Sequence, residues 1–193
     1  GRTIDEIQKQ LELLGYKVFY DVFNSSDFHL PQTRNRLLIF ATTAKLPKNF
    51  IFDSKSVAEC FDKVYKNLSV FSYTSTVEIL SQEVDSKYFL SERIKPTLLA
   101  DGSANFKSNS EINLAIARPL TATMHKMHRA CQDNYYSQDY IESHGAINPA
   151  KTHSKEELAK LPIRKLTPEE AFLLQGFPSS FVTNARAQKV SDG

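Results

Sequence analysis

Apolar residues near the start of the chain recur at the spacing of an amphipathic helix. Four of them share one helical face, at intervals of three or four residues: Ile4, Ile7, Leu11 and Leu14. Thr3 and Glu6 have the spacing of an N-terminal capping box, and Gly15 supplies a C-terminal stop. The pattern predicts an amphipathic helix over residues 4–14.

Two short segments after this helix have the apolar patterns of strands. Residues 16–22 alternate between polar and apolar toward Phe23, as in a half-buried strand. Residues 36–41 form a continuous apolar run, which predicts a second and more fully buried strand. The polar residues 24–35 are expected to form the loop between them.

A second helical face follows a break at residues 45–49, where a proline and two lysines interrupt the pattern. The apolar residues of this face are Val57, Cys60, Phe61, Val64, Tyr65 and Leu68. Cys60 is therefore predicted to be a small core residue and not a reactive thiol. From residue 69 to 163 the sequence has short strand-like pieces between polar and glycine clusters, at 77–80, 97–100 and 112–116.

The clearest local signal lies near the C-terminal end. Thr167 is placed as an N-cap, Pro168 occupies the first helical position, and Glu170 closes a capping box. Gly176 ends the pattern, and Pro178 is expected to prevent the helix from resuming. These signals predict a helix that begins at Pro168 and ends before Gly176.

The composition of the chain limits the classes of protein to which it can belong. The 193 residues are 41% hydrophobic and 24% charged, as in ordinary globular proteins. No apolar run reaches the length of a membrane span, so we expect a cytoplasmic protein with no membrane partner. The net charge of +2 does not by itself require a nucleic-acid partner. Cys60 and Cys131 lack C-x-x-C spacing, and His125 and His128 lack partner ligands, so no metal site is predicted.

Residues 31–36 read Pro-Gln-Thr-Arg-Asn-Arg and have the donors to grip a flat polar ligand. Gln32, Arg34 and Arg36 have period-two spacing, which places them on one face if the loop enters its strand there. Arginine presents a rigid, permanently charged fork to such ligands. An isolated Arg-x-Arg is more often a solvated loop end, so its interpretation depends on a second string.

That second string covers residues 164–178 and reads Arg-Lys-Leu-Thr-Pro-Glu-Glu-Ala-Phe-Leu-Leu-Gln-Gly-Phe-Pro. Together the two strings resemble the back half of the DNA (cytosine-5) methyltransferases. The resemblance implies that Arg36 hydrogen-bonds the flipped target cytosine, Arg34 braces the active-site loop and Gln32 contacts backbone near the site. It implies a scaffold role for Arg164, Thr167, Glu170, Gln175 and Gly176.

Between the two strings this family places its target recognition domain, which reads sequence in the major groove of duplex DNA. Residues 118–129 fit that role as a threonine-rich loop followed by histidine, lysine and arginine. The predicted DNA contacts are Arg118, Thr121, Thr123, His125, Lys126, His128 and Arg129, with Arg93 and Lys95 as further phosphate contacts. Further candidates for backbone contact or base stacking are Phe106, Lys107, Asn134, Tyr135 and Tyr136, although aromatic residues more often belong to a core.

Several strings of the family do not occur in this sequence. Its members use a cysteine from a Pro-Cys loop, a glutamate from Glu-Asn-Val and a glycine-rich turn that binds S-adenosylmethionine. Neither Cys60 nor Cys131 follows proline, and the six glycines are scattered. Residues 188–193 resemble the approach to the last motif of the family. We therefore expect a chain that transfers no methyl group alone and binds no S-adenosylmethionine alone.

The expected architecture is α+β. A remnant of a Rossmann-like methyltransferase lobe, one helix and two strands, is expected at residues 1–44, a mixed and irregular target recognition domain at 45–163, and a return helix at 164–193. The leading hypothesis is the recognition half of a bacterial restriction-modification enzyme. The missing N-terminal catalytic half would lie on the same longer chain or on a second subunit, and exposed apolar surface would favour self-association. A non-catalytic DNA-binding subunit and an RNA methyltransferase relative are the alternatives.

Overall fold

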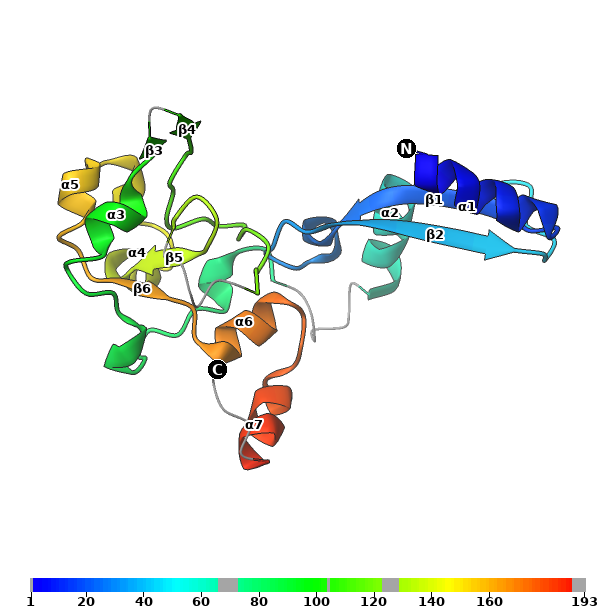
Figure 1. The fold of residues 1–193 in the computed structure, drawn as a ribbon. Helices are drawn as coiled ribbons and strands as arrows, with labels where there is room; N and C mark the ends of the chain where they lie inside the picture. The colour runs from blue at the N-terminus through cyan, green and yellow to red at the C-terminus, as the bar shows by residue number, and fades with distance from the viewer. Residues whose placement is uncertain (1, 66–72, 104, 123–128, 189–193) are drawn as a thin grey trace. The chain divides into compact units, whose positions relative to one another are not determined.

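The computed structural model describes residues 2–65, 73–103, 105–122 and 129–188 (Figure 1). Contacts divide the chain into two compact units. Unit 1 comprises Gly1–Phe28 and Arg34–Ser69, and unit 2 comprises His29–Thr33 and Val70–Gly193. This division differs from the expected boundaries after residues 44 and 163, because the helix that follows residue 45 joins unit 1 and the C-terminal segment joins unit 2. No helix in the described ranges is long and apolar enough to cross a membrane.

Unit 1 is built around one antiparallel pair of strands (Figure 1). Its elements are α1 (Arg2–Leu13), β1 (Lys17–Asn24), the 3-10 helix η1 (Ser25–Phe28), β2 (Asn35–Thr42) and α2 (Ser54–Tyr65). The predicted first helix and both strands are confirmed. The predicted capping box is wrong, because α1 begins at Arg2 and Thr3 therefore lies inside its first turn. Gly15 follows α1 with φ +85°, the left-handed conformation expected of a C-terminal stop.

The two faces of the β1–β2 sheet have different surroundings. The pairing register places Phe19, Phe23 and Phe40 on one face. Their rings pack in an aromatic cluster with Phe28, Phe50, Phe52 and Phe61. The opposite face carries Tyr20, Val22, Leu37 and Ile39, and we call these four residues the apolar face.

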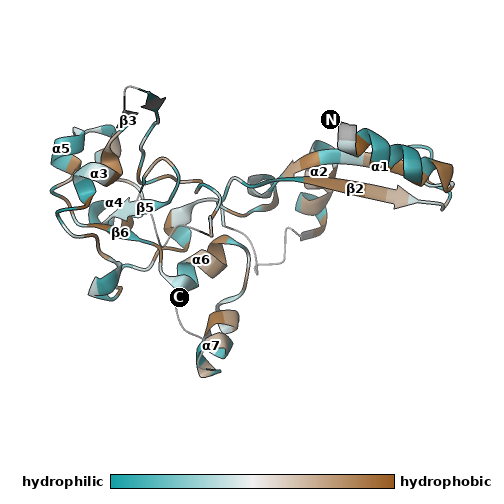
Figure 2. Cartoon of the chain, viewed as in Figure 1, coloured by the Kyte–Doolittle hydropathy of each residue, from teal (hydrophilic) through white to brown (hydrophobic). Residues whose placement is uncertain are grey.

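The apolar face is largely exposed, with exposed fractions from 39% for Ile39 to 52% for Val22. Figure 2 shows the apolar character of β2 along its length. The prediction that the second strand is more fully buried is therefore wrong. The aromatic cluster covers only part of the sheet, so three consecutive residues of the continuous apolar run, Leu37, Leu38 and Ile39, are 47%, 48% and 39% exposed.

Helix α2 corrects the prediction for Cys60. Phe61 packs on Phe28, with ring centroids 5.5 Å apart, whereas Cys60 is exposed and Val64 is 63% exposed. Fewer of the apolar residues of α2 are therefore buried than its sequence pattern predicts. Leu68, the last residue of the predicted face, lies outside the described residues.

Unit 2 consists of short elements joined by long irregular segments (Figure 1). They are η3 (Thr76–Glu78), η4 (Ser86–Tyr88), α3 (Lys95–Leu99), β3 (Gly102–Ser103), β4 (Phe106–Lys107), β5 (Tyr135–Ser137), α4 (Gln138–Glu142), η5 (Pro149–Lys151), α5 (Lys155–Leu158), β6 (Ile163–Lys165), α6 (Pro168–Leu174) and α7 (Ser179–Ala187). In the described residues β3 pairs with β4 and β5 pairs with β6, both antiparallel.

Two hydrophobic clusters lie on the two faces of the β5–β6 pair. Tyr136 belongs to the cluster that contains Leu166 and Leu174. Tyr135 belongs to the cluster that contains Leu98 and Ile163. Adjacent tyrosines thus project to opposite faces of the strand and anchor one cluster each.

Four sequence predictions for unit 2 are wrong, and one is confirmed. Residues 76–78 and 95–99 are helical where strand-like pieces were expected, and residues 112–116 form no strand. Pro178 does not prevent a further helix, because it is the N-cap residue of α7, which begins at Ser179. The predicted capped helix after Thr167 is confirmed as α6, with both hydrogen bonds of the capping box present.

Candidate nucleic-acid interface

The first half of the Pro-Gln-Thr-Arg-Asn-Arg motif is built into unit 2. Gln32 forms an isolated parallel bridge with Ala117, and its side chain is only 2% exposed. The Ala117 N–H donates to the Pro31 carbonyl oxygen at 2.8 Å, and the Thr33 N–H donates to the Ala117 carbonyl oxygen at 2.8 Å. The motif is thereby hydrogen-bonded to the residue that immediately precedes Arg118.

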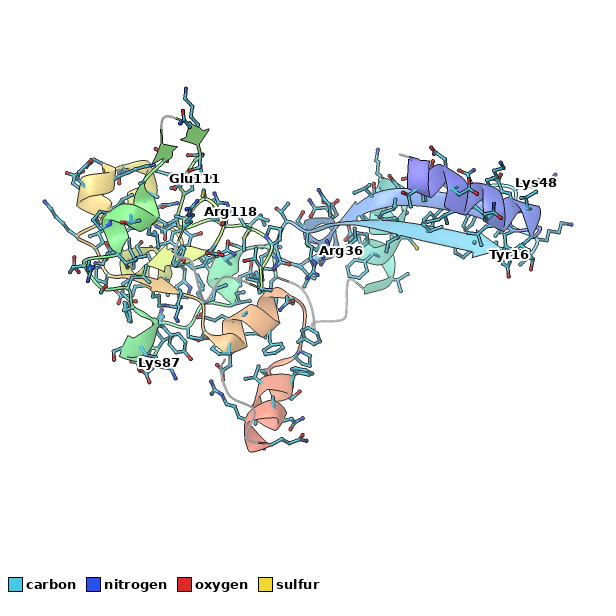
Figure 3. The ribbon with its side chains drawn as sticks, viewed as in Figure 1. Tyr16, Arg36, Lys48, Lys87, Glu111 and Arg118 are labelled. Atoms are coloured by element: carbon cyan, nitrogen blue, oxygen red, sulfur yellow. The ribbon has the colours of Figure 1, made fainter. Side chains whose placement is uncertain are left out.

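The second half of the motif belongs to unit 1. The Asn24 side-chain oxygen accepts from the Arg34 N–H at 3.1 Å, and the Arg34 carbonyl oxygen accepts from the Ser25 N–H at 3.1 Å. Arg36 lies at the start of β2 and is exposed (Figure 3), and its guanidinium donates to the Asn35 carbonyl oxygen at 2.8 Å. Among the described residues, neither Arg34 nor Arg36 forms an ion pair.

The period-two spacing of the three donors therefore does not apply to Gln32. β2 begins at Asn35, so only Arg36 of the three lies in the strand. The two arginines extend from unit 1, and the amide is buried in unit 2.

The second motif forms a buried ion pair inside unit 2. Arg164 and Glu170 are both 0% exposed, and they meet in a bidentate pair with N–O distances of 2.7 and 2.8 Å. Glu170 also accepts from the Thr167 N–H at 2.7 Å and the Ser81 N–H at 2.8 Å, while Arg164 donates to the Ser81 carbonyl oxygen at 2.8 Å. This network joins β6, the start of α6 and the segment at Ser81.

The end of the second motif contacts the start of the first. Gly176 has φ +84°, and a Cβ atom at this position would lie 3.1 Å from the Leu30 side chain. Gln175 closes α6 through a hydrogen bond from its side chain to the Ala171 carbonyl oxygen at 3.1 Å. Since Leu30 precedes Pro31, the two motifs, which are far apart in the sequence, meet within unit 2.

The segment that starts at Arg118 is held by residues just before β5. The Asn134 side chain accepts from the Arg118 N–H at 2.8 Å and donates to the Arg118 carbonyl oxygen at 3.0 Å. The Thr121 hydroxyl donates to the Asp133 carboxylate at 3.4 Å. The Arg118 guanidinium donates to the Glu111 carboxylate and to the Glu111 carbonyl oxygen, each at 3.2 Å (Figure 3).

The other predicted DNA contacts fall into three groups. Arg93 and Arg129 are exposed, as a phosphate contact requires. Lys95 is 2% exposed, and its ammonium group donates to the Glu92 carboxylate and the Leu161 carbonyl oxygen at 2.6 Å each. Lys95 therefore stabilises the fold and is not available at the surface. The remaining predicted contacts lie outside the described residues: Thr123, His125, Lys126 and His128.

The two aromatic candidates within β5 belong to the core. Tyr135 and Tyr136 are both buried, and desolvation by burial raises the pKa of each hydroxyl well above its ordinary value. Neither ring is exposed for base stacking. No group of three histidine, cysteine or acidic side chains in the described ranges could hold a metal ion.

The sequence patterns missed the residues that organise this segment. Glu111, Asp133 and Asn134 act through contacts 7 to 16 residues apart in the chain. The one local signal is an Asp-Asn pair directly before an aromatic strand, since asparagine and aspartate side chains readily replace backbone hydrogen-bonding partners.

The sequence is similar to several Type II methyltransferases. Residues 1–192 match the family described as C-5 cytosine-specific DNA methylase. The chain is 31% identical over 184 residues to the Type II methyltransferase M.DsaV of Dactylococcopsis salina, covering 94% of this chain and 44% of that protein. It is 30% identical over 199 residues to the Type II methyltransferase M.SsoII of Shigella sonnei, covering 94% and 41%. The chain thus spans less than half the length of these relatives.

Solved methyltransferase structures share the fold. The Dnmt2 methyltransferase of S. pombe superposes with a TM-score of 0.66 at 17% identity, covering 93% of this chain and 52% of that one. The Entamoeba histolytica methyltransferase EhMeth superposes with a TM-score of 0.63 at 16% identity, covering 98% and 50%. The family match over nearly the whole sequence shows that this chain belongs to the C-5 cytosine-specific DNA methylases.

Proposed function

We propose that this chain is the target-recognition, DNA-binding part of a cytosine-5 DNA methyltransferase of the bacterial restriction-modification type. The observation that carries the proposal is the pairing of Gln32 with Ala117, which joins the first motif to the segment that begins at Arg118. In this proposal the segment after Ala117 contacts duplex DNA, and Arg36 hydrogen-bonds the cytosine that has been removed from the helix.

The proposed roles within the first motif follow from exposure and donor geometry. Arg36 is exposed at the start of β2, and its fork of N–H donors suits the C2 carbonyl oxygen of a flipped cytosine. The Arg34 backbone is fixed by Asn24 and Ser25, which suits a residue that braces a loop. The buried Gln32 side chain suits a contact with backbone near the site.

We further propose that the chain alone transfers no methyl group. Cytosine-5 methyl transfer in this family implies a cysteine nucleophile and S-adenosylmethionine as methyl donor. The two cysteines lie at an exposed position on α2 and a half-buried loop position, and neither follows proline. The glycines with positive φ, at 15, 102, 145 and 176, belong to separate turns, so the described residues do not fit the cofactor as a glycine-rich cradle.

The missing functions are proposed to come from an N-terminal catalytic half. The relatives are more than twice the length that this chain covers, which leaves room for such a half. The exposed apolar face of unit 1 is the surface that we propose it covers. Whether that half belongs to a longer chain or to a second subunit distinguishes the leading proposal from a split enzyme.

DNA binding is tested by fluorescence anisotropy with duplex DNA at several salt concentrations. We expect weak binding whose logarithmic affinity falls linearly with the logarithm of salt concentration. Arg129→Ala should reduce the slope by about 1, whereas Lys63→Ala on α2 removes the same charge and should leave it unchanged. Equal effects of the two substitutions would contradict the proposed interface. Competition by tRNA as strong as that by duplex DNA would favour the RNA-methyltransferase alternative.

Catalysis is tested with radiolabelled S-adenosylmethionine and duplex DNA. We expect no incorporation with this chain alone and incorporation after a chain that carries the Pro-Cys loop and the cofactor motifs is added. Incorporation by the isolated chain would overturn the proposed inactivity. Restoration by a separately encoded natural partner would favour the split enzyme.

A further inference from the structure

The backbone of Arg118 is held by a side chain instead of a strand. The Asn134 amide oxygen accepts from the Arg118 N–H at 2.8 Å, and its amide nitrogen donates to the Arg118 carbonyl oxygen at 3.0 Å. A side-chain amide has a donor and an acceptor arranged like those of a peptide group, so it can replace a neighbouring strand at one residue. Asn134 therefore fixes both polar backbone groups of Arg118.

Asn134 is itself rigidly placed. It is 4% exposed and lies directly before β5, in which Tyr135 and Tyr136 are core residues. The Tyr135 carbonyl oxygen accepts from the Asn113 N–H at 2.9 Å, which ties the start of β5 to the segment that leads to Arg118. A buried amide with both functions satisfied specifies one geometry, because any other leaves polar groups unpaired.

The Arg118 guanidinium is oriented but not sequestered. Its pair with the Glu111 carboxylate is 3.2 Å long, and the two side chains are 20% and 48% exposed. Solvent screening makes such a pair weak, so a phosphate or a guanine edge can replace the carboxylate as acceptor. Arg118 is thus fixed through its backbone, while its charged end remains exchangeable.

We infer that Asn134 is a positioning residue for DNA binding, which holds the Arg118 backbone so that the guanidinium is presented to an acceptor on duplex DNA. The inference rests on the proposed function. It assigns Asn134 a role through Arg118 and no contact with DNA of its own. Fixing the backbone in advance lowers the conformational entropy that binding must otherwise overcome.

A double-mutant cycle in the whole chain tests whether Asn134 acts through Arg118. We expect Asn134→Ala to weaken duplex binding about tenfold and to have no further effect in an Arg118→Ala background. A general structural role would instead weaken binding equally in both backgrounds. The matched control is Thr167→Ala, which removes the hydrogen bond that the hydroxyl of a second mostly buried polar residue, 7% exposed, accepts from the Glu170 N–H at the start of α6. This control should retain the wild-type affinity.

Asn134→Asp provides a test that does not depend on losing the side chain. A neutral carboxylic acid has one acceptor and one donor and restores both hydrogen bonds to Arg118, whereas the ionised form has no donor. Burial and the neighbouring Asp133 carboxylate favour the neutral form as the pH falls. We expect the affinity ratio of wild type to variant to be about tenfold at pH 8 and to approach one at pH 5. Because the affinity is expressed as a ratio of wild type to variant, the effects of groups that titrate in both proteins cancel.

Exchange of the Arg118 amide hydrogen gives a readout without DNA. It should become faster in Asn134→Ala while amides in β6 keep the wild-type rate. If wild type binds DNA and Asn134→Ala binds equally well, this inference fails and the proposed function stands. The same holds if the pH ratio of Asn134→Asp stays constant in a folded variant. If wild type does not bind duplex DNA, both fail.

Discussion

At the scale of single residues, unit 2 depends on a charge pair that has no access to water. Arg164 and Glu170 are fully buried and form further hydrogen bonds with Ser81, Lys165 and Thr167. Glu170→Gln leaves the Arg164 charge buried without a counter-charge, so we expect the free energy of unfolding to fall by about 3–5 kcal/mol. Urea denaturation followed by circular dichroism measures the loss.

The neighbouring residue supplies the control for this prediction. Glu169 pairs with Arg186 at 2.7 Å, but the two side chains are 37% and 49% exposed. Glu169→Gln should therefore cost no more than about 1 kcal/mol. Equal losses for the two substitutions would show that burial of the first pair has no energetic consequence.

Two glycines allow the energetic cost of backbone strain to be measured separately from the cost of side-chain crowding. Gly176 and Gly15 have φ of +84° and +85°, but a Cβ atom would lie 3.1 Å from Leu30 at Gly176 and would contact nothing within 4 Å at Gly15. Gly15→Ala should cost about 1 kcal/mol through backbone strain alone, and Gly176→Ala should cost about 1 kcal/mol more. NMR amide signals of each unit during urea unfolding give both values. Equal costs would mean that Leu30 yields without strain.

Which residues could be predicted depends on how local their contacts are. The capping box of Thr167 and Glu170 was read from the sequence because both partners lie within one helical turn. The hydrogen bonds between the Asn134 side chain and the Arg118 backbone could not be predicted from the sequence, since the two residues lie 16 positions apart. Lys95 shows the same limit: a lysine in a basic turn is normally at the surface, and only the tertiary structure brings the Leu161 carbonyl oxygen to its ammonium group as an acceptor.

At the scale of elements, periodic segments were predictable and short ones were not. α1 and β1 repeat their patterns over 12 and 8 residues, and β2 contains a continuous apolar run. By contrast, α3 has five residues, too few for periodicity to distinguish a helix from a strand. The exposure of the apolar face is a property of the layers around a strand, which its own sequence cannot reveal.

The connection between β1 and α2 gives a pH-dependent prediction at this scale. The Asp21 carboxylate accepts from the Ser54 N–H at 2.7 Å and the Val22 N–H at 2.8 Å, and these hydrogen bonds, the first being the larger cause, lower the pKa of Asp21. Because the folded-state pKa is lowered, this contribution to stability is present above the ordinary value of 3.8 and is lost as the pH falls below it.

NMR titration of the Asp21 carboxyl group in folded and urea-unfolded chains checks the shift. We expect a lower midpoint in the folded chain, with the Ser54 amide signal following the same titration. The stability difference between wild type and Asp21→Asn should shrink as the pH falls from 5 to 2. A folded-state midpoint at or above the unfolded one would refute the role of these hydrogen bonds.

At the scale of the whole molecule, the two motifs that identify the family are separated in sequence but joined in unit 2. Leu30 contacts the position of Gly176, and Pro31 to Thr33 pair with Ala117. These contacts show how a long segment can lie between two short motifs: both ends of the segment are anchored by the same unit. In unit 1, by contrast, the apolar face of the sheet is exposed to solvent.

That face leads to a prediction about association. Tyr20, Val22, Leu37 and Ile39 form a contiguous exposed apolar surface on a two-stranded sheet. Burial of such a surface is favourable, so the isolated chain should self-associate through it in the absence of a catalytic half. We expect the weight-average mass in sedimentation equilibrium to rise with concentration.

The double variant Val22→Lys/Leu37→Lys places two like charges opposite each other on this face and should keep the monomer mass. Leu13→Lys, at a 72% exposed position on α1, adds positive charge outside the face and should associate like wild type. A wild-type mass that stays monomeric at every concentration, or equal behaviour of the double variant and Leu13→Lys, would show that the apolar face does not drive association.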